Sequence, residues 1–179
     1  MSRELIVVDT ETTGLHAGAA ILEVAAINVT SGEEMHFVPH VTREKLGAAQ
    51  PAAMQINRYY ERGLWRHALN AGDTEDAYWQ LSDMLSGNTF GGCNPAFDAQ
   101  MLGGVLPETD WHHRLADLAA YAGPALLLAP NELVGLADIC ERLGVQNNGE
   151  HTALGDARAT AECFRKLTHY YANRMEPVK

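Results

Sequence analysis

Residues 4–14, ELIVVDTETTG, place an almost wholly apolar run directly before two acidic residues, Asp9 and Glu11. Such a run is typical of a strand at the centre of a sheet. Side chains two positions apart in a strand point to the same face, so the two carboxylates are expected side by side. Like charges that close repel each other unless a cation lies between them. Taken alone, however, a D-x-E pattern more often marks two solvated side chains at a strand end than a metal site.

The segments that follow predict an α/β domain with a mixed sheet. Residues 12–20 predict a loop, and strands over 21–29 and 34–41 complete an antiparallel meander with the first strand. Residues 89–94, TFGGCN, predict a short strand that another backbone approaches closely. No linker interrupts the pattern, so we expect a single domain over residues 1–179. Helices are expected at 51–56, at 73–87 with Asp73 or Thr74 as cap, from Pro95, at 131–143 with Asn131 as cap, and at about 152–171.

The composition excludes several classes of protein. The chain has 179 residues, 46% of them apolar, and a formal net charge of −10, which disfavours a protein that coats nucleic acid with a broad basic surface. No apolar run approaches the roughly 18 residues of a membrane span, and we expect no signal peptide. The three cysteines are scattered and form no CxxC pair, which favours a reducing cytoplasm over a disulfide framework or a zinc ribbon.

Two further motifs carry acidic residues at predicted helix starts. NPAFD, residues 94–98, places Asp98 in a first helical turn, and HTALGDA, residues 151–157, places His151 before the last helix and Asp156 within it. Each residue has an ordinary explanation. An acid in a first turn favours the helix dipole, Asn94 suits a helix cap, and a loop histidine needs no partner. Taken singly, none of these motifs requires an active site.

Their order along the chain is more specific. VVDTETTGL, NPAFDAQML and HTALGDARATAECF together resemble the three motifs of the DEDDh (DnaQ-like) 3′→5′ exonucleases, the group that contains the proofreading subunit of bacterial replicative polymerases, ribonuclease T and oligoribonuclease. The resemblance spans residues 4 to about 171 and implies a ribonuclease H-like fold with helices flanking the mixed sheet. It also implies the catalytic set: Asp9, Glu11, Asp98 and Asp156 as metal ligands, with His151 as general base.

A second H-x-x-x-x-D pair competes for the third motif. His112 and Asp117, in WHHRLADL, have the same spacing but follow Asp98 too soon. The residues after Asp156 match the last helix of the family, whereas those after Asp117 do not. We therefore choose His151 and Asp156, and interpret His112 as a surface or structural residue.

The implied chemistry is phosphodiester hydrolysis. Four carboxylates carry about the charge that two Mg²⁺ or Mn²⁺ ions neutralise, and two such ions roughly 3.5 to 4 Å apart stabilise the attacking and leaving oxygens. A largely neutral imidazole near pH 7 suits the base that accepts a proton from water. The expected product is a nucleoside 5′-monophosphate released from the 3′ end of a single strand. By resemblance, the substrate-binding residues are Thr10, Thr12, Thr13, Gly14, Leu15, Asn57, Asn94 and Phe97, where Asn57 stands in place of a histidine common in the family.

Three functions remain open at this point. The first and third motifs favour a DNA exonuclease of the proofreading or repair type. An exoribonuclease of the oligoribonuclease or ribonuclease T type is the alternative, and an inactive nucleic-acid-binding module of the same fold is a third. The acidic surface suggests that a partner such as a DNA polymerase delivers the strand, and the chain is compatible with a monomer or a homodimer.

Overall fold

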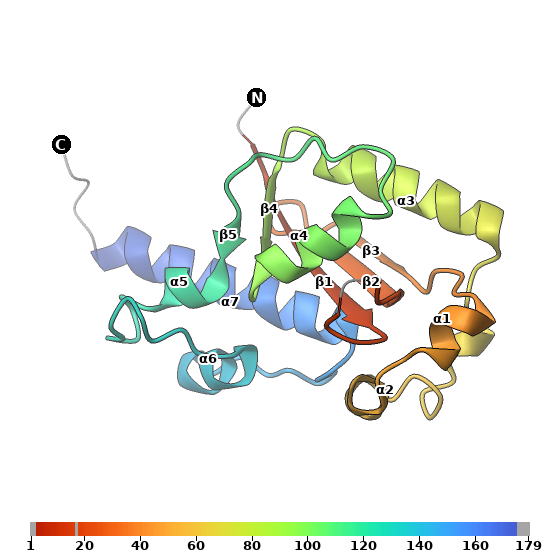
Figure 1. Cartoon of the computed structure of the whole chain (residues 1–179). Helices are drawn as coiled ribbons and strands as arrows, with labels where there is room; N and C mark the ends of the chain where they lie inside the picture. Colours follow the sequence, from red (N-terminus) through yellow and green to blue (C-terminus); the bar gives the residue numbers. More distant parts are fainter. Residues whose placement is uncertain (1–2, 17, 175–179) are drawn as a thin grey trace.

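A computed structural model describes residues 3–16 and 18–174, so Ala17 of the predicted loop and both ends of the predicted 1–179 domain lie outside the described residues. The fold is built on one mixed sheet in the order β3-β2-β1-β4-β5 (Figure 1). The first three strands form the predicted antiparallel meander, and β4 and β5 run parallel to β1. The strands are β1 (Leu5–Thr12), β2 (Ile21–Asn28), β3 (Glu34–Phe37), β4 (Thr89–Gly92) and β5 (Ala116–Asp117).

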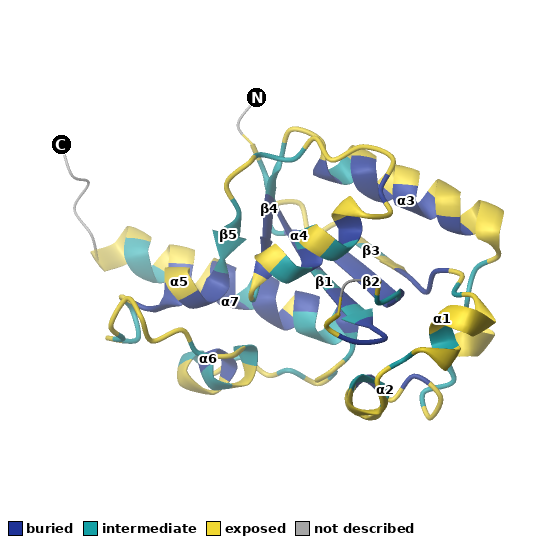
Figure 2. Cartoon of the chain, viewed as in Figure 1, coloured by how far each residue is buried: buried dark blue, intermediate teal, exposed yellow. Residues whose placement is uncertain are grey.

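Helices cover both faces of the sheet. Successive side chains of β1 point to opposite faces and are buried on both, so each face needs helices packed against it. Ile6 and Val8 pack towards α3 and α4, whereas Val7 packs towards α5, α6 and α7 (Figure 1). In Figure 2 the central strands of the sheet and the helix sides facing them are mostly buried, and the outer helix sides are exposed. Asp9 and Glu11 lie on the same face of β1 as Val7, the face that α7 covers. The helices are α1 (Arg43–Gly47), α2 (Pro51–Asn57), η1 (Leu64–Arg66), α3 (Ala71–Leu85), α4 (Pro95–Gly103), α5 (Leu118–Ala122), α6 (Leu136–Leu143) and α7 (Ala153–Arg174).

The predicted close approach at β4 is confirmed. A Cβ atom on Gly91 would lie 2.7 Å from Cδ1 of Leu5, and one on Gly92 would lie 3.0 Å from the carbonyl oxygen of Val8. Both neighbours belong to β1. Small residues therefore allow β4 to pair beside β1, and this pairing places the start of α4 next to the end of β1.

Several predicted boundaries were wrong. Helix α3 begins at Ala71, two residues before the predicted start. The side chain of Asn70 caps it by accepting from the backbone N–H of Asp73 at 2.9 Å, so neither Asp73 nor Thr74 is the cap. Helix α6 begins at Leu136 after Gly135, because residues 129–132 close into a turn in which Glu132 accepts from the backbone N–H of Ala129. Strand β3 ends at Phe37, two residues before a proline that has no N–H to donate. Helices α1, η1 and α5 and strand β5 were not predicted.

No helix within residues 3–16 and 18–174 has the length and apolarity to cross a membrane.

Candidate active site

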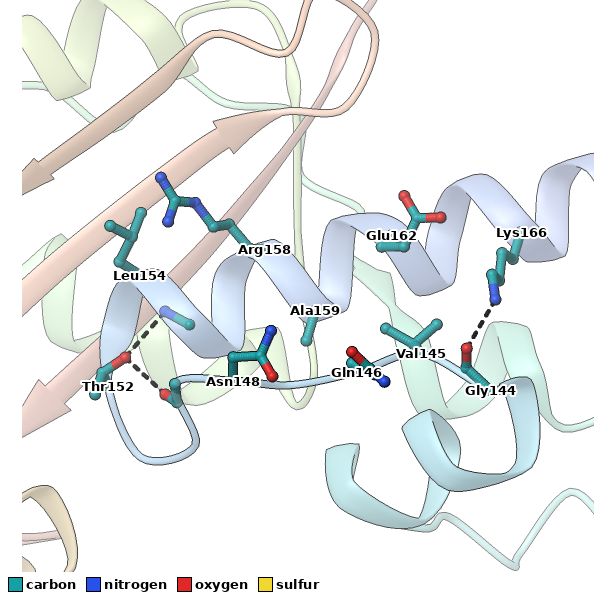
Figure 3. A pocket seen from close by; sticks show the side chains of 12 residues that line it. Gly144, Val145, Gln146, Asn148, Thr152, Leu154, Arg158, Ala159, Glu162 and Lys166 are labelled. Carbon is teal, nitrogen blue, oxygen red and sulfur yellow. Dashed lines mark hydrogen bonds between the residues drawn. The ribbon is translucent and has the colours of Figure 1, made fainter.

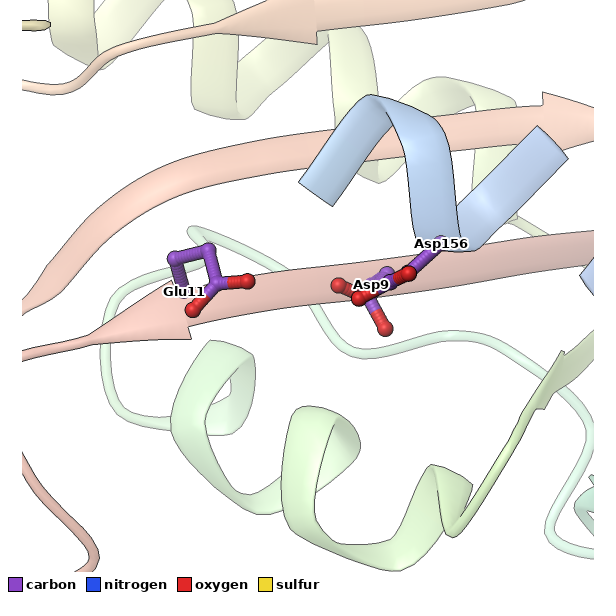
Figure 4. Close-up of side chains that lie close together, drawn as sticks. All are labelled: Asp9, Glu11 and Asp156. Carbon is purple, nitrogen blue, oxygen red and sulfur yellow. The ribbon is translucent and has the colours of Figure 1, made fainter. Parts of the chain in front are cut away.

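Three carboxylates converge where β1 ends and α7 begins. Asp9 and Glu11 lie on one face of β1, and Asp156 reaches them from the first turn of α7 (Figure 4). One oxygen from each of the three groups lies within 4.8 Å of the others. An all-oxygen set of this kind suits a hard divalent cation such as Mg²⁺ or Mn²⁺. The donors present therefore fit the metal that the sequence predicts.

The fourth predicted acid, Asp98, joins the cluster from α4 on the other side of β1. It is buried, and its Oδ1 accepts from both the backbone N–H of Thr10 at 2.9 Å and the Thr10 hydroxyl at 2.7 Å. Thr10 lies between Asp9 and Glu11 in the strand, so these bonds hold Asp98 against the cluster. Among neighbouring charges, Asp98 makes the largest contribution to raising the pKa of Asp9. The structure thus brings three of the four predicted acids within one oxygen cluster, and the fourth, Asp98, is bonded to Thr10 between two of them.

The four acids repel one another strongly in the absence of cations. Burial, followed by the charges of Asp98, Asp156 and Glu11, raises the pKa of Asp9 well above its ordinary value. Burial and the charge of Asp156 raise the pKa of Glu11 to about 7. Burial also raises the pKa of Asp98 to about 7, although the hydrogen bonds from Thr10 oppose the rise. Near neutral pH, full ionisation of the cluster therefore requires compensating positive charge.

For the metal-free protein we expect the free energy of unfolding to fall as the pH rises from about 5 to about 8. The pKa values of Glu11 and Asp98 are about 7 in the fold, against about 4 in the unfolded chain, so the folded state holds more protons in this window. The free energy of unfolding is therefore highest below the unfolded pKa of about 4. It decreases as the pH rises through the folded pKa of about 7. A shift of this size corresponds to roughly 4 kcal/mol for each group that titrates independently.

Thermal melts across this pH range, with EDTA or with saturating Mg²⁺, measure the effect. The melting temperature in EDTA should decrease towards pH 8, and Mg²⁺ should restore most of the loss because bound cations stabilise the ionised carboxylates. A melting temperature in EDTA that rises with pH would show that the cluster is not self-repelling.

The predicted histidine lies at the edge of this cluster. His151 is exposed, sits two residues before α7, and donates its backbone N–H to Oδ2 of Asp156 at 3.2 Å. Its φ of 60° is a left-handed conformation that side-chain-bearing residues seldom adopt. The rival pair has local structural roles: Nδ1 of His112 accepts from the backbone of Arg114, and Asp117 caps α5. Asp117 does, however, line a cavity of about 470 Å³ together with Asp9, Asn94 and Asp156.

The loop before α7 also holds Asp156 directly. Asn147 donates from Nδ2 to Oδ1 of Asp156 at 2.5 Å, and the Thr152 hydroxyl bridges the carbonyl of Gly149 and the backbone N–H of Gly155 (Figure 3). A cavity of about 580 Å³ lies between this loop and α7. Its two cations are already engaged: Arg158 bonds to Glu34, and Lys166 bonds to main-chain carbonyls that include Gly144 (Figure 3). Asn147 was not predicted as a contact of the site.

Gly155→Ala is expected to destabilise the protein by about 1 to 3 kcal/mol, the usual cost of overpacking. A Cβ atom at Gly155 would overlap the main chain of Gly149, so the loop that positions Asp156 would have to move. Gly103→Ala is the matched control, because nothing lies within 4 Å of a Cβ atom there. Urea unfolding of both variants provides the measurement, and equal midpoints for the two would contradict the packing argument.

A buried ion pair lies directly beside the acids and was not predicted. Glu23 on β2 faces Glu11 in the strand register and is 1% exposed. Arg62 binds both of its oxygens, at 2.8 and 2.9 Å, and Nε2 of His36 lies 2.8 Å from Oε1. Burial raises the pKa of Glu23, but the hydrogen bonds from His36 and Arg62 outweigh it and lower the pKa to about 2. Glu23 is therefore ionised near neutral pH.

Six of the eight predicted substrate-binding residues line one of two cavities. A cavity of about 230 Å³ is lined by Thr10, Thr12, Leu15, Asn57 and Phe97, and Leu15 is 80% exposed at its rim. Asn94 lies instead in the cavity with Asp9, in a left-handed conformation and without a capping bond.

The other loop residues make internal contacts. Thr13 accepts from the backbone of Ala20, and Gly14 lies against Gln50. The amide of Asn57 is also used internally, since it donates to the carbonyl of Thr12 and accepts from the backbone N–H of Tyr59.

Known proteins share both this sequence pattern and this fold. The family model described as Exonuclease matches residues 6–164. A DNA polymerase III subunit epsilon-like protein of Rhodobacter capsulatus is 27% identical over 90% of this chain, but the chain spans only 23% of that protein. E. coli exonuclease I, solved in complex with a dT13 oligonucleotide, has a TM-score of 0.74 at 20% identity and covers 97% of this chain and 42% of its own.

Two shorter structures align over most of their own length. Exonuclease X in complex with 5′ overhanging duplex DNA has a TM-score of 0.65 at 22% identity and covers 94% of this chain and 93% of its own. S. pombe Pop2p, in a form with Mg²⁺ and Mn²⁺ bound, has a TM-score of 0.68 at 14% identity, with 97% and 86% covered. These likenesses confirm the predicted ribonuclease H-like fold.

Proposed function

The chain belongs to the exonuclease family, and from that premise we propose that it is a DEDDh-type 3′→5′ exonuclease that depends on divalent cations. It would remove nucleoside 5′-monophosphates from the end of a single strand. The observation that carries the proposal is the approach of oxygens from Asp9, Glu11 and Asp156 to within 4.8 Å, beside a loop that holds His151.

Each acid has a distinct part in the proposed site. Asp9, Glu11 and Asp156 would hold Mg²⁺ or Mn²⁺, with Asp98 completing the set, and we propose two ions. Such cations stabilise charge on phosphate oxygens and make water more acidic. His151 lies next to Asp156 at the solvent-facing edge, where its imidazole would take the proton of the attacking water. Thr10 holds Asp98 in place through two hydrogen bonds.

The terminal nucleotide would enter the cavity of about 230 Å³ next to Glu11. Its walls include the apolar side chains of Leu15, Ile56 and Phe97, which suit the face of a nucleobase. Asn57 supports this cavity through its bond to the Thr12 carbonyl. Because the walls are apolar, we expect binding to depend more on stacking than on the identity of the base.

We propose DNA as the substrate. Exonuclease I and exonuclease X, which share the fold, were solved with DNA, and the curated relative is named for a DNA polymerase subunit. With a net charge of −10, the chain attracts a long polyanionic strand only weakly. Delivery of the strand by a partner such as a DNA polymerase would compensate for that weakness.

Digestion of 5′-labelled single-stranded DNA and RNA, with Mg²⁺ or with EDTA, tests the proposal. We expect DNA to shorten one nucleotide at a time from its 3′ end in Mg²⁺ and to remain intact in EDTA. Shortening of RNA alone would assign an exoribonuclease. Intact DNA and RNA in both buffers would refute catalysis and leave a binding module.

A further inference from the structure

The buried Glu23–Arg62 ion pair links the sheet to the loop that carries His151. The side chain of Arg62 is 20% exposed and that of Glu23 is 1% exposed, so the pair is largely shielded from solvent. Arg62 binds Glu23 with two nitrogens in a fork, the geometry in which a guanidinium is most firmly oriented. Arg62 comes from the segment between α2 and η1, whereas Glu23 comes from the sheet.

The same pair also reaches the chain just before α7. Nη1 of Arg62 donates to the carbonyl of Asn57 at 3.2 Å and makes a longer contact, 3.5 Å, with the carbonyl of His151. Oε2 of Glu23 accepts from the backbone N–H of Ala153 at 3.3 Å. The ion pair therefore contacts the main chain at positions 151 and 153, while Asp156 holds the backbone N–H of His151.

These contacts matter because His151 occupies a costly conformation. With a φ of 60°, a residue bearing a Cβ atom is disfavoured by about 1 to 3 kcal/mol, and such conformations persist only where surrounding bonds enforce them. Asp156 fixes the N–H of His151 and Arg62 approaches its carbonyl, so both peptide groups of the residue are restrained. The side chain of His151 is exposed, so little packing orients it. The backbone conformation therefore sets the direction in which the imidazole leaves the chain.

We infer that Arg62, oriented by Glu23, is a positioning residue that holds His151 in the left-handed conformation and so directs its imidazole towards the carboxylate cluster. This inference rests on the proposed function, in which His151 is the base. It predicts that Arg62 acts through His151 and not through the substrate.

Kinetics of Arg62→Met test the catalytic part. We expect kcat on single-stranded DNA to fall about 100-fold, the order of loss that a misplacement of about 1 Å causes, with KM and the Mg²⁺ requirement little changed. In a His151→Asn background the same substitution should change kcat by no more than about twofold, because the residue through which it acts is already gone. An equal loss in both backgrounds, or full recovery at high Mg²⁺, would overturn the inference.

Two further variants separate positioning from folding. Glu23→Met with Arg62→Met removes both charges and leaves no unpaired buried ion, so it should fold and show the same loss of kcat. Arg58→Met is the matched control, because Arg58 lies in the same segment and forms its ion pair with the exposed Glu61. Full activity of the double variant would contradict the inference.

Hydrogen exchange provides a readout that does not depend on catalysis. In Arg62→Met we expect faster exchange at the amides of His151 and Ala153, and unchanged exchange in the sheet. Unchanged exchange at these two amides would overturn the positioning role. Wild-type protein that degrades neither DNA nor RNA would refute the proposed function, and the exchange result would still stand on its own.

Discussion

Asp9→Asn is expected to lower kcat by about 1000-fold or more, because a ligated cation contributes several kcal/mol to the transition state and each 1.36 kcal/mol is a factor of ten. The same substitution should raise the melting temperature of the metal-free protein at pH 8. The pKa of Asp9 is raised by burial and by four neighbouring carboxylates, so its ionised form costs stability that a neutral amide of similar shape does not. Activity and stability therefore change in opposite directions.

Single-turnover kinetics in Mg²⁺ and thermal melts in EDTA provide the two measurements. Asp76→Asn is the control, since Asp76 is an exposed acid on α3 and should leave both quantities unchanged. An Asp9→Asn protein with wild-type kcat would remove Asp9 from the metal site. A lower melting temperature in EDTA would show that Asp9 contributes to folding and is not held there at a cost.

His151→Asn is expected to lower kcat by about 10² to 10⁴, the usual contribution of a general base. Asparagine is chosen because it tolerates the left-handed conformation that His151 adopts, so the loop keeps its shape while the imidazole is removed. The Mg²⁺ concentration for half-maximal activity should change little, because the acids that would bind the metal remain.

The control is His112→Asn, which alters the histidine of the competing H-x-x-x-x-D pair. The imidazole of His112 contacts its chain neighbours His113 and Arg114, away from the carboxylate cluster, and its substitution should leave kcat unchanged. A full loss of activity in His112→Asn with none in His151→Asn would reverse the assignment of the third motif.

The sequence predicted the elements whose patterns are long. The buried run of β1 and the apolar run of β2 give the meander directly, and the small residues of β4 indicate close packing. β5 has only two residues, too few to display any period, and was missed. The start of α6 was wrong because Asn131 resembles a cap, whereas the turn at residues 129–132 depends on a side-chain bond from Glu132.

The site was predicted from motifs, and its supporting contacts were not. Arg62 and Glu23 are 39 positions apart, and Glu23 and Ala153 are 130 apart, so no local pattern links them. One signal was nevertheless available. Glu23 is the only charged residue in ILEVAAIN, and a carboxylate in a buried strand needs a cationic partner. Asn147 gave no such signal, because a polar residue in a loop is ordinary.

Both outer edges of the sheet are short. On one side β5 has two residues, and on the other β3 has four, one of which, Glu34, is tied to Arg158 of α7. Such edges present few unpaired amide and carbonyl groups, and a charged residue on an edge further discourages an added strand. An intruding polypeptide would therefore find little backbone to pair with here, which protects the protein against aggregation through strand-to-strand growth.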